Sequence, residues 1–109
     1  MELNEYQAAA KKTAIYPNAG NNIIYPTLGL IGEAGEVANK VKKIIRDGGG
    51  KISEEARETI KEELGDILWY VSQLAIELRV PLDEIAAGNL KKLSSRQKRA
   101  VLGGSGDRR

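Results

Sequence analysis

The sequence predicts an all-α fold, an antiparallel four-helix bundle-like arrangement that oligomerises through its helices. Apolar residues recur at the three- and four-residue spacing of helices along most of the chain, and no segment alternates as a strand does. Short breaks rich in proline or glycine separate four such segments, as in helical bundles. The 109 residues suffice for one domain, which we place at 1–99, followed by a glycine-rich basic tail at 100–109.

The first half of the chain contains two of the expected helices. The first, "LNEYQAAAKKTAI", runs from Leu3 to Ile15 and ends before Pro17. The segment from Tyr16 to Pro26 combines proline, asparagine and glycine, which is typical of a loop. The second helix is expected from about Thr27 to Arg46.

The second half begins with a glycine break at 48–50, whose shortness makes the flanking helices antiparallel neighbours. Ser53 is a good N-cap for the third helix, because two glutamates follow it in the first turn. That helix is expected to end at about Leu78 or Arg79, and Pro81 opens a fourth helix that runs to about residue 99. The final "LGGSGDRR" is expected to be mobile without a ligand.

The composition excludes several kinds of chemistry. The chain has no cysteine and no histidine, so it forms no disulfide, no thiolate or imidazole metal site and no Ser-His-Asp or Cys-His nucleophile system. Any metal must be bound by oxygen, which suits hard cations. The sequence has no run of about 18 apolar residues, the length needed to span a membrane. Its polar N-terminus does not resemble a signal peptide. We therefore expect a cytoplasmic protein.

Two pairs of carboxylates border the apolar stripes of neighbouring helices. Glu33 and Glu36 lie three residues apart in "GEAGEV", and Glu63 and Asp66 repeat that spacing in "EELGD". At about 100° per residue, each pair lies beside the buried stripe of its helix and not opposite it. A single such pair is common on solvated helices. Two pairs on adjacent antiparallel helices predict that all four carboxylates converge at one rim.

Four converging carboxylates repel one another strongly in a half-buried site. Hard divalent cations relieve that repulsion, and carboxylate oxygens are their preferred ligands. The same stretch carries Gly29, Gly32 and Gly35 inside a helix, where each glycine costs about 1 kcal/mol relative to alanine. We interpret these glycines as room for close approach of the backbone and of the ligand that the metals hold.

The combination of "GEAGEV" with "EELGDILWY" is the ExxE then ExxD pattern of a known family. The chain resembles the MazG-like all-α nucleoside triphosphate pyrophosphohydrolases. The resemblance extends over nearly the whole chain, from "NEYQ" near the start, through "YPTLGLIGEAGEV" and "NLKKLSSRQKR", to the final "GSGDRR". It is specific for the superfamily and less so for the preferred nucleotide.

The resemblance implies the hydrolysis of a nucleoside triphosphate, ribo- or deoxyribo-, to the monophosphate and pyrophosphate. It implies Mg²⁺, with Mn²⁺ as the alternative, bound by Glu33, Glu36, Glu63 and Asp66. One of these carboxylates, or the neighbouring Glu62, would take the proton of the attacking water. The reaction would serve either to sanitise the nucleotide pool or to control nucleotide levels.

Positive and aromatic residues are expected to complete the site. Lys40 lies on the same helix edge as the first carboxylate pair, and Lys43 lies one turn further on, where a solvated lysine is the alternative. Tyr70 either stacks on the nucleotide or forms the edge of the core. The fourth helix offers three further phosphate contacts in the family's spacing: Asn89, Lys92 and Arg96.

The tail resembles the family's glycine-rich ending, except that Ala100 replaces the glycine expected after Arg99. If the tail closes, Asp107 and Arg109 approach the ligand, and disorder is the alternative.

The back of the third helix carries Trp69 and Ile76, which a monomer would leave exposed and which therefore predict an interface. The resemblance likewise implies a homodimer or homotetramer with a site shared between subunits. Two other functions stay open: a helical module that binds nucleotide or metal without turnover, and a nucleic-acid-binding protein. Residues 91–109 contain seven basic residues and one acidic residue, a net +6, but residues 1–90 contain ten against fourteen, a net −4. That acidic body argues against nucleic acid as a partner.

Overall fold

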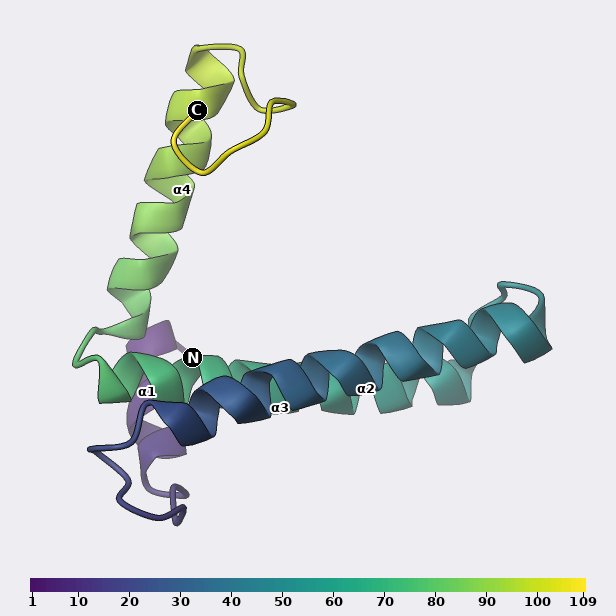
Figure 1. The fold of residues 1–109 in the computed structure, drawn as a ribbon, viewed down its shortest axis with the longest axis horizontal. Coiled ribbons are helices and arrows are strands. Elements are labelled where there is room, and N and C mark those ends of the chain that lie inside the picture. Colours follow the sequence, from purple (N-terminus) through teal and green to yellow (C-terminus); the bar gives the residue numbers. More distant parts are fainter.

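The helices lie close to their expected positions. The computed structural model describes residues 1–109 as α1 (Leu3–Lys11), α2 (Ile24–Gly48), α3 (Glu54–Glu77) and α4 (Leu82–Lys98), with no strand (Figure 1). The predicted all-α fold of four helices is confirmed. No helix combines the length and apolar character that a membrane crossing requires.

Side chains account for the places where helices begin and end. Ser53 Oγ accepts a hydrogen bond from the Ala56 N–H at 3.1 Å, so the predicted N-cap of α3 is confirmed. α2 begins three residues earlier than expected, because the Asn22 side chain accepts hydrogen bonds from the N–H groups of Ile24 and Tyr25. α1 ends earlier than expected, at Lys11.

α2 and α3 form an antiparallel pair that runs the length of the molecule (Figure 1). Gly49 and Gly50 reverse the chain between them with φ values of 62° and 83°, a conformation that glycine adopts without strain. Both helices place their half-buried residues at alternating spacings of three and four, so that the side chains interdigitate. Glu33 of α2 and Glu63 of α3 belong to these rows and are half-buried between apolar neighbours.

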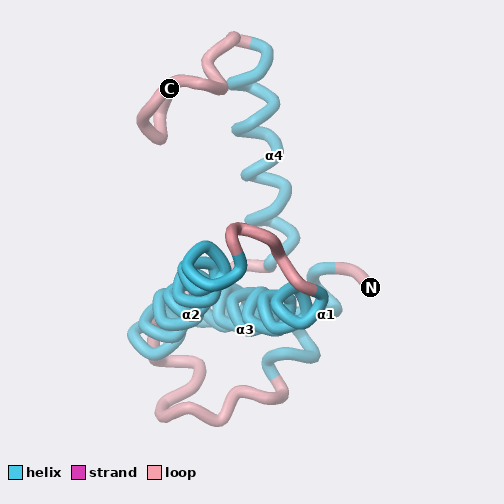
Figure 2. Tube along the Cα trace, turned by 90° about the vertical axis from the view of Figure 1, so that its right-hand side faces the viewer, coloured by secondary structure: helices cyan, strands magenta, loops and turns pink.

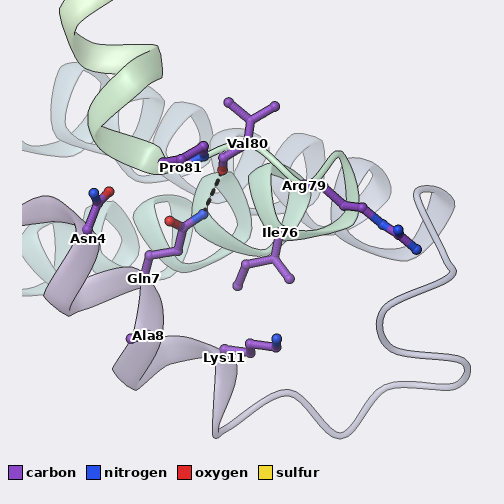
Figure 3. A pocket seen from close by; sticks show the side chains of 8 residues that line it. All are labelled: Asn4, Gln7, Ala8, Lys11, Ile76, Arg79, Val80 and Pro81. Carbon is purple, nitrogen blue, oxygen red and sulfur yellow. Dashed lines mark hydrogen bonds between the residues drawn. The ribbon is translucent and has the colours of Figure 1, made fainter.

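α1 packs across the C-terminal half of α3, on the side away from α2 (Figure 2). Trp69 Nε1 donates a hydrogen bond to Thr13 Oγ1 at 2.7 Å, and the indole ring meets the edge of Tyr16. Ile76 lies beside α1 and is also half-buried (Figure 3). The prediction that Trp69 and Ile76 are exposed in one chain was wrong, because α1 and the loop after it cover this face of α3.

α4 is attached through its first turn. Pro81 precedes α4 and provides no side-chain cap. Two α1 side chains replace it: Asn4 accepts from the Asp83 N–H at 3.0 Å, and Gln7 accepts from the Leu82 N–H at 2.9 Å. Gln7 also donates to the Val80 carbonyl, at the edge of a cleft of about 490 Å³ (Figure 3).

Beyond this attachment, α4 projects away from the α2–α3 pair (Figures 1 and 2). The radius of gyration is 16.8 Å, whereas a compact domain of about 100 residues has about 13 Å. The four helices therefore do not close into one bundle within a single chain.

The loop between α1 and α2 is organised by Glu77 at the end of α3. Its carboxylate accepts hydrogen bonds from the Tyr16 hydroxyl, from the Gly20 N–H at 2.8 Å and from the Asn22 N–H at 3.0 Å. Burial alone would raise the pKa of Glu77, but these three donors outweigh it and hold the pKa below its usual value. Tyr16 is raised in pKa by burial and by its bond to Glu77.

Glu77→Gln is expected to destabilise the protein at neutral pH and to have little effect in acid. A carboxylate with a depressed folded-state pKa contributes stability above its unfolded pKa and loses it as pH falls through the folded value. The difference in thermal midpoint between wild type and variant should therefore be largest near pH 7 and shrink below pH 4.5, the usual value for this side chain. A difference that stays constant down to pH 3 would show that the charge of Glu77 does not matter.

The C-terminal end of α4 is a Schellman turn with an unusual residue in it. The Val101 N–H donates to the Arg96 carbonyl at 2.9 Å, and the Ala100 N–H donates to the Gln97 carbonyl at 3.1 Å. Ala100 takes the left-handed position with φ of 58°. The bend that the family's glycine would make is thus formed by alanine, which has a steric cost there.

Ala100→Gly is expected to stabilise this turn by about 1 kcal/mol, because glycine has no Cβ to clash in the left-handed region. Amide hydrogen exchange at Val101 measures the effect, and it should slow about five-fold. Unchanged or faster exchange at Val101 would show that the turn does not require the left-handed conformation.

Candidate metal centre

Three of the four predicted carboxylates meet between α2 and α3. Glu33, Glu63 and Asp66 each place a carboxylate oxygen within 4.8 Å of the others. Glu33 and Glu63 face each other across the antiparallel pair, and Asp66 lies one turn further along α3 on the same edge. The arrangement follows from the i, i+3 spacing on α3 and from the pairing of the two helices.

The electrostatics of this cluster favour a bound cation. A hydrogen bond between Glu33 and Glu63 raises the pKa of Glu33 most, followed by burial and then by the negative charges of Glu63, Asp66 and Glu36. A cation bound among these carboxylates would offset the negative charges that raise the pKa of Glu33. Oxygen donors of this kind, at this separation, fit Mg²⁺ or Mn²⁺ and do not fit a soft metal.

Glu36 and Lys40 lie on the margins of the cluster. Glu36 does not join the three close carboxylates: it is exposed, one turn along α2, and acts on Glu33 through its charge. Lys40 Nζ lies 3.7 Å from Glu63 Oε1. Lys40 therefore provides positive charge at the edge of the carboxylates, as its position in the sequence predicts.

An aromatic pocket opens beside the carboxylates. It has a volume of about 360 Å³ and is lined by five residues: Thr13, Glu33, Asp66, Trp69 and Tyr70. Aromatic side chains line it and lie directly behind it. The Trp69 and Tyr70 rings meet edge to face, with 5.0 Å between their centroids. Tyr16 stacks on Tyr25 with a centroid separation of 4.6 Å. A flat, partly polar group would fit there next to the carboxylates.

Gly29 explains part of this geometry. An alanine Cβ at Gly29 would lie 2.6 Å from Tyr70 Cδ1 and closer still to its Cε1 and Cζ atoms. The Tyr70 ring thus lies directly on the α2 backbone at this glycine. By contrast, a Cβ at Gly32 or Gly35 meets nothing within 4 Å. The close approach predicted for the glycines is therefore present at Gly29, where an aromatic ring contacts the backbone. At the other two glycines there is open space.

Sequence reasoning missed Thr13, which lines the site, and Tyr6, whose pKa responds to the charge of Asp66. Tyr6 of α1 has its pKa raised first by burial and then by the negative charge of Asp66. Thr13 lines the aromatic pocket and holds the indole of Trp69. No spacing along α1 reveals what it packs against, so the sequence does not single out these two residues.

The remaining predicted residues lie away from the carboxylates within one chain. Lys43 lines a neighbouring cleft toward the end of α2, which Lys40 also lines. Asn89 and Lys92 are exposed on the projecting α4. Arg96 is 6% exposed and donates a hydrogen bond to the Asp107 carbonyl. The tail is held in this fold-back by Arg109, which donates to the carbonyls of Val101, Leu102 and Gly106.

The fold and the site define a helical protein with carboxylates arranged for hard cations beside an aromatic pocket. Residues 26–101 match the MazG nucleotide pyrophosphohydrolase domain. The matched segment contains all four predicted carboxylates and most of the chain, so the protein belongs to this family.

One curated relative is similar to this chain over the full length of both proteins. The chain is 53% identical to the gene 37 protein of Mycobacterium phage L5, with all of both chains aligned. The name of that relative states no activity. No solved structure matches the chain.

Proposed function

We propose that this protein is a Mg²⁺-dependent pyrophosphohydrolase that converts a nucleoside triphosphate, ribo- or deoxyribo-, and water to the monophosphate and pyrophosphate. The observation that carries the proposal is the cluster of Glu33, Glu63 and Asp66 within 4.8 Å, with an aromatic pocket next to it. Family membership supports the same reaction class. The reaction would sanitise the nucleotide pool or control nucleotide levels.

Each part of the site has a distinct task in this proposal. Glu33, Glu63 and Asp66 would hold the cation, and Glu36, which lies outside these three in the structure, would be the fourth ligand. The cation, when bound, neutralises phosphate charge and lowers the pKa of water. One of the cluster carboxylates, or the exposed Glu62, accepts the proton of the attacking water.

The aromatic pocket is proposed to hold the nucleoside. Tyr70 and Trp69 offer ring surfaces for a base, and Thr13 offers a hydroxyl oxygen for a polar edge. Because these residues lie immediately beside Glu33 and Asp66, a base bound there would place its phosphates at the carboxylates. Positioning of this kind and charge stabilisation supply most of the catalysis in phosphoryl transfer.

We further propose that the working form is a homodimer or homotetramer. Only eight of 109 residues are buried, fewer than a stable domain of this length requires. Large apolar side chains are exposed on the side of the α2–α3 pair opposite the carboxylates: Ile31 64%, Val41 41%, Ile45 66%, Leu64 54% and Leu68 41%. A second copy covering this face would supply the missing core.

An oligomer also gives α4 a place in the site. Ile85, Leu90 and Leu93 are exposed along α4, which projects from the rest of the chain. If α4 packs against another copy, Asn89 and Lys92 can reach that copy's phosphates, and Arg96 can follow when the tail that bonds it moves aside, as the family resemblance implies. Sedimentation of wild type against Leu64→Lys tests the interface, and a variant that sediments like wild type would argue against this face.

Product analysis on a panel of ribo- and deoxyribonucleoside triphosphates tests the reaction. Monophosphate and pyrophosphate should appear with Mg²⁺, disappear with EDTA and be lost in Glu36→Ala. Diphosphate and phosphate would indicate a different cleavage by the same fold. No turnover on any nucleotide would favour a module that binds nucleotide or metal without hydrolysis.

A further inference from the structure

A second polar cleft lies on the same side of the α2–α3 pair as the carboxylates, toward the glycine turn. It has a volume of about 510 Å³, and three lysines line it: Lys40, Lys43 and Lys51. On a helical wheel, Lys40 and Lys43 share the α2 edge of Glu36, and Thr59 in the cleft shares the α3 edge of Asp66. The cleft therefore continues the groove in which the carboxylates lie.

The glycine turn brings the third lysine into the cleft. Gly49 and Gly50 take left-handed conformations, and the Lys51 N–H donates to the Gly48 carbonyl at 3.1 Å. This tight reversal returns the chain to the last turn of α2, so Lys51 faces the same space as Lys43. Figure 1 shows this end of the pair far from both α1 and α4, so no other part of the chain covers it.

Of the three lysines of the cleft, only Lys40 forms an ion pair, with Glu63. Lys43 and Lys51 form no salt bridge. Of the two acidic residues in the cleft, Asp47 has both carboxylate oxygens bonded to Arg46 at 2.8 Å, and its pKa is lowered first by that bond and further by the charge of Lys43. Glu55 is the other, in the first turn of α3. The cleft thus offers free ammonium groups for an anion.

Lys40 connects this cleft to the metal centre. Its ammonium lies 3.7 Å from Glu63, and its side chain also lines the cleft. Seen along the pair, the groove presents an aromatic pocket, then carboxylates, then lysines. A nucleoside triphosphate has the same order of groups: a base, the phosphate at the cleaved bond, and the distal phosphates.

We propose that the Lys43–Lys51 cleft binds the distal phosphates of the substrate, and the pyrophosphate that they become, so that the substrate lies along the groove with its base toward α1. Lys51, which lies outside the predicted site residues, is assigned to this role together with Lys43. The proposal rests on the proposed pyrophosphohydrolase function and adds the direction in which the substrate binds. Ammonium groups suit this task because they act as compact charges on phosphate oxygens.

Product inhibition tests the proposal, because the two products occupy opposite ends of the groove. In Lys43→Ala and Lys51→Ala, the inhibition constant of pyrophosphate should rise about ten-fold, as expected for a lost charged hydrogen bond. The inhibition constant of the monophosphate should stay within about two-fold. Lys51→Arg should restore most of the pyrophosphate affinity.

Lys42→Ala is the matched control, because Lys42 carries the same charge on the same helix, is exposed and does not line the cleft. It should leave both constants unchanged. Equal weakening of both products, or weakening by Lys42→Ala to the same extent, would overturn the assignment. The assignment would also be overturned if both cleft variants kept the wild-type inhibition constant for pyrophosphate.

Calorimetric titration of pyrophosphate with Mg²⁺ separates this inference from the proposed function. If the wild type hydrolyses nucleotides but binds pyrophosphate with the same affinity as the cleft variants, the proposed role of the cleft is refuted and the proposed function stands. Wild type that hydrolyses nothing would refute the function. If pyrophosphate binding were still lost in Lys51→Ala, the cleft would stand as an anion site.

Discussion

Glu33→Gln is expected to abolish hydrolysis while raising the stability of the cation-free protein. Activity should fall about 100-fold or more, because a metal ligand is lost. A glutamine amide can donate a hydrogen bond to Glu63 and carries no charge. Removing one like-charge contact is worth about 0.5 kcal/mol. The thermal midpoint in EDTA should therefore rise by roughly 2–4 °C.

The pH dependence of that stability difference has a definite sign. The pKa of Glu33 is raised in the folded state, first by its hydrogen bond to Glu63, so ionisation of Glu33 destabilises the fold. In EDTA the midpoint of wild type should fall relative to the variant as pH rises from 4.5 toward neutrality. This is the reverse of the behaviour expected at Glu77, whose pKa is lowered.

Glu62→Gln provides the control for stability, since Glu62 is exposed beside Glu63 and outside the cluster. It should leave the midpoint within about 1 °C of wild type. A Glu33→Gln variant that is less stable than wild type in EDTA would contradict the electrostatic account of the site. One that retains full activity would contradict the role of Glu33 as a metal ligand.

Gly29→Ala and Gly32→Ala are expected to change stability in opposite directions. At Gly29 the new methyl group overlaps the Tyr70 ring, so the ring or the helix must shift, at a cost of about 1–3 kcal/mol or more. At Gly32 the methyl group meets open space and removes the entropy penalty of a helical glycine, a gain of about 0.5–1 kcal/mol.

Urea unfolding of the two variants measures this difference, with the midpoint moving down for Gly29→Ala and up for Gly32→Ala. The displaced Tyr70 should also weaken nucleotide binding in Gly29→Ala. Both midpoints moving upward would show that Tyr70 yields to the methyl group without loss. Gly29→Ala combined with Tyr70→Ala should recover part of the lost stability, since the clash is then removed.

Local signals predicted the helices well, because their causes lie within a few residues. Ser53, the glycine turn and Pro81 set the ends of α3 and the start of α4 as expected. The start of α2 was missed because Asn22 caps two N–H groups from a segment that reads as loop. The meeting of Glu33, Glu63 and Asp66 has a local cause too, because a three-residue spacing on two paired helices determines which side chains meet, whereas Glu36, also expected there, stays outside the three.

Contacts between segments that are distant in the sequence could not be predicted from these local signals. The position of Tyr70 over Gly29 depends on how two helices pack, and the covering of Trp69 depends on α1. The capping of α4 by Asn4 and Gln7 joins residues more than 70 positions apart. A helical wheel identifies an apolar face but not its partner, which is why Trp69 and Ile76 were assigned to an interface between chains.

Trp69 gives this protein a built-in optical probe. It is the one tryptophan in the sequence, and it lines the same pocket as Glu33 and Asp66. Its indole N–H is bonded to Thr13, so we expect its emission to respond both to charge at the carboxylates and to separation of α1 from α3. Quenching titrations with cation and with nucleotide can therefore follow each binding step in the unlabelled wild-type chain.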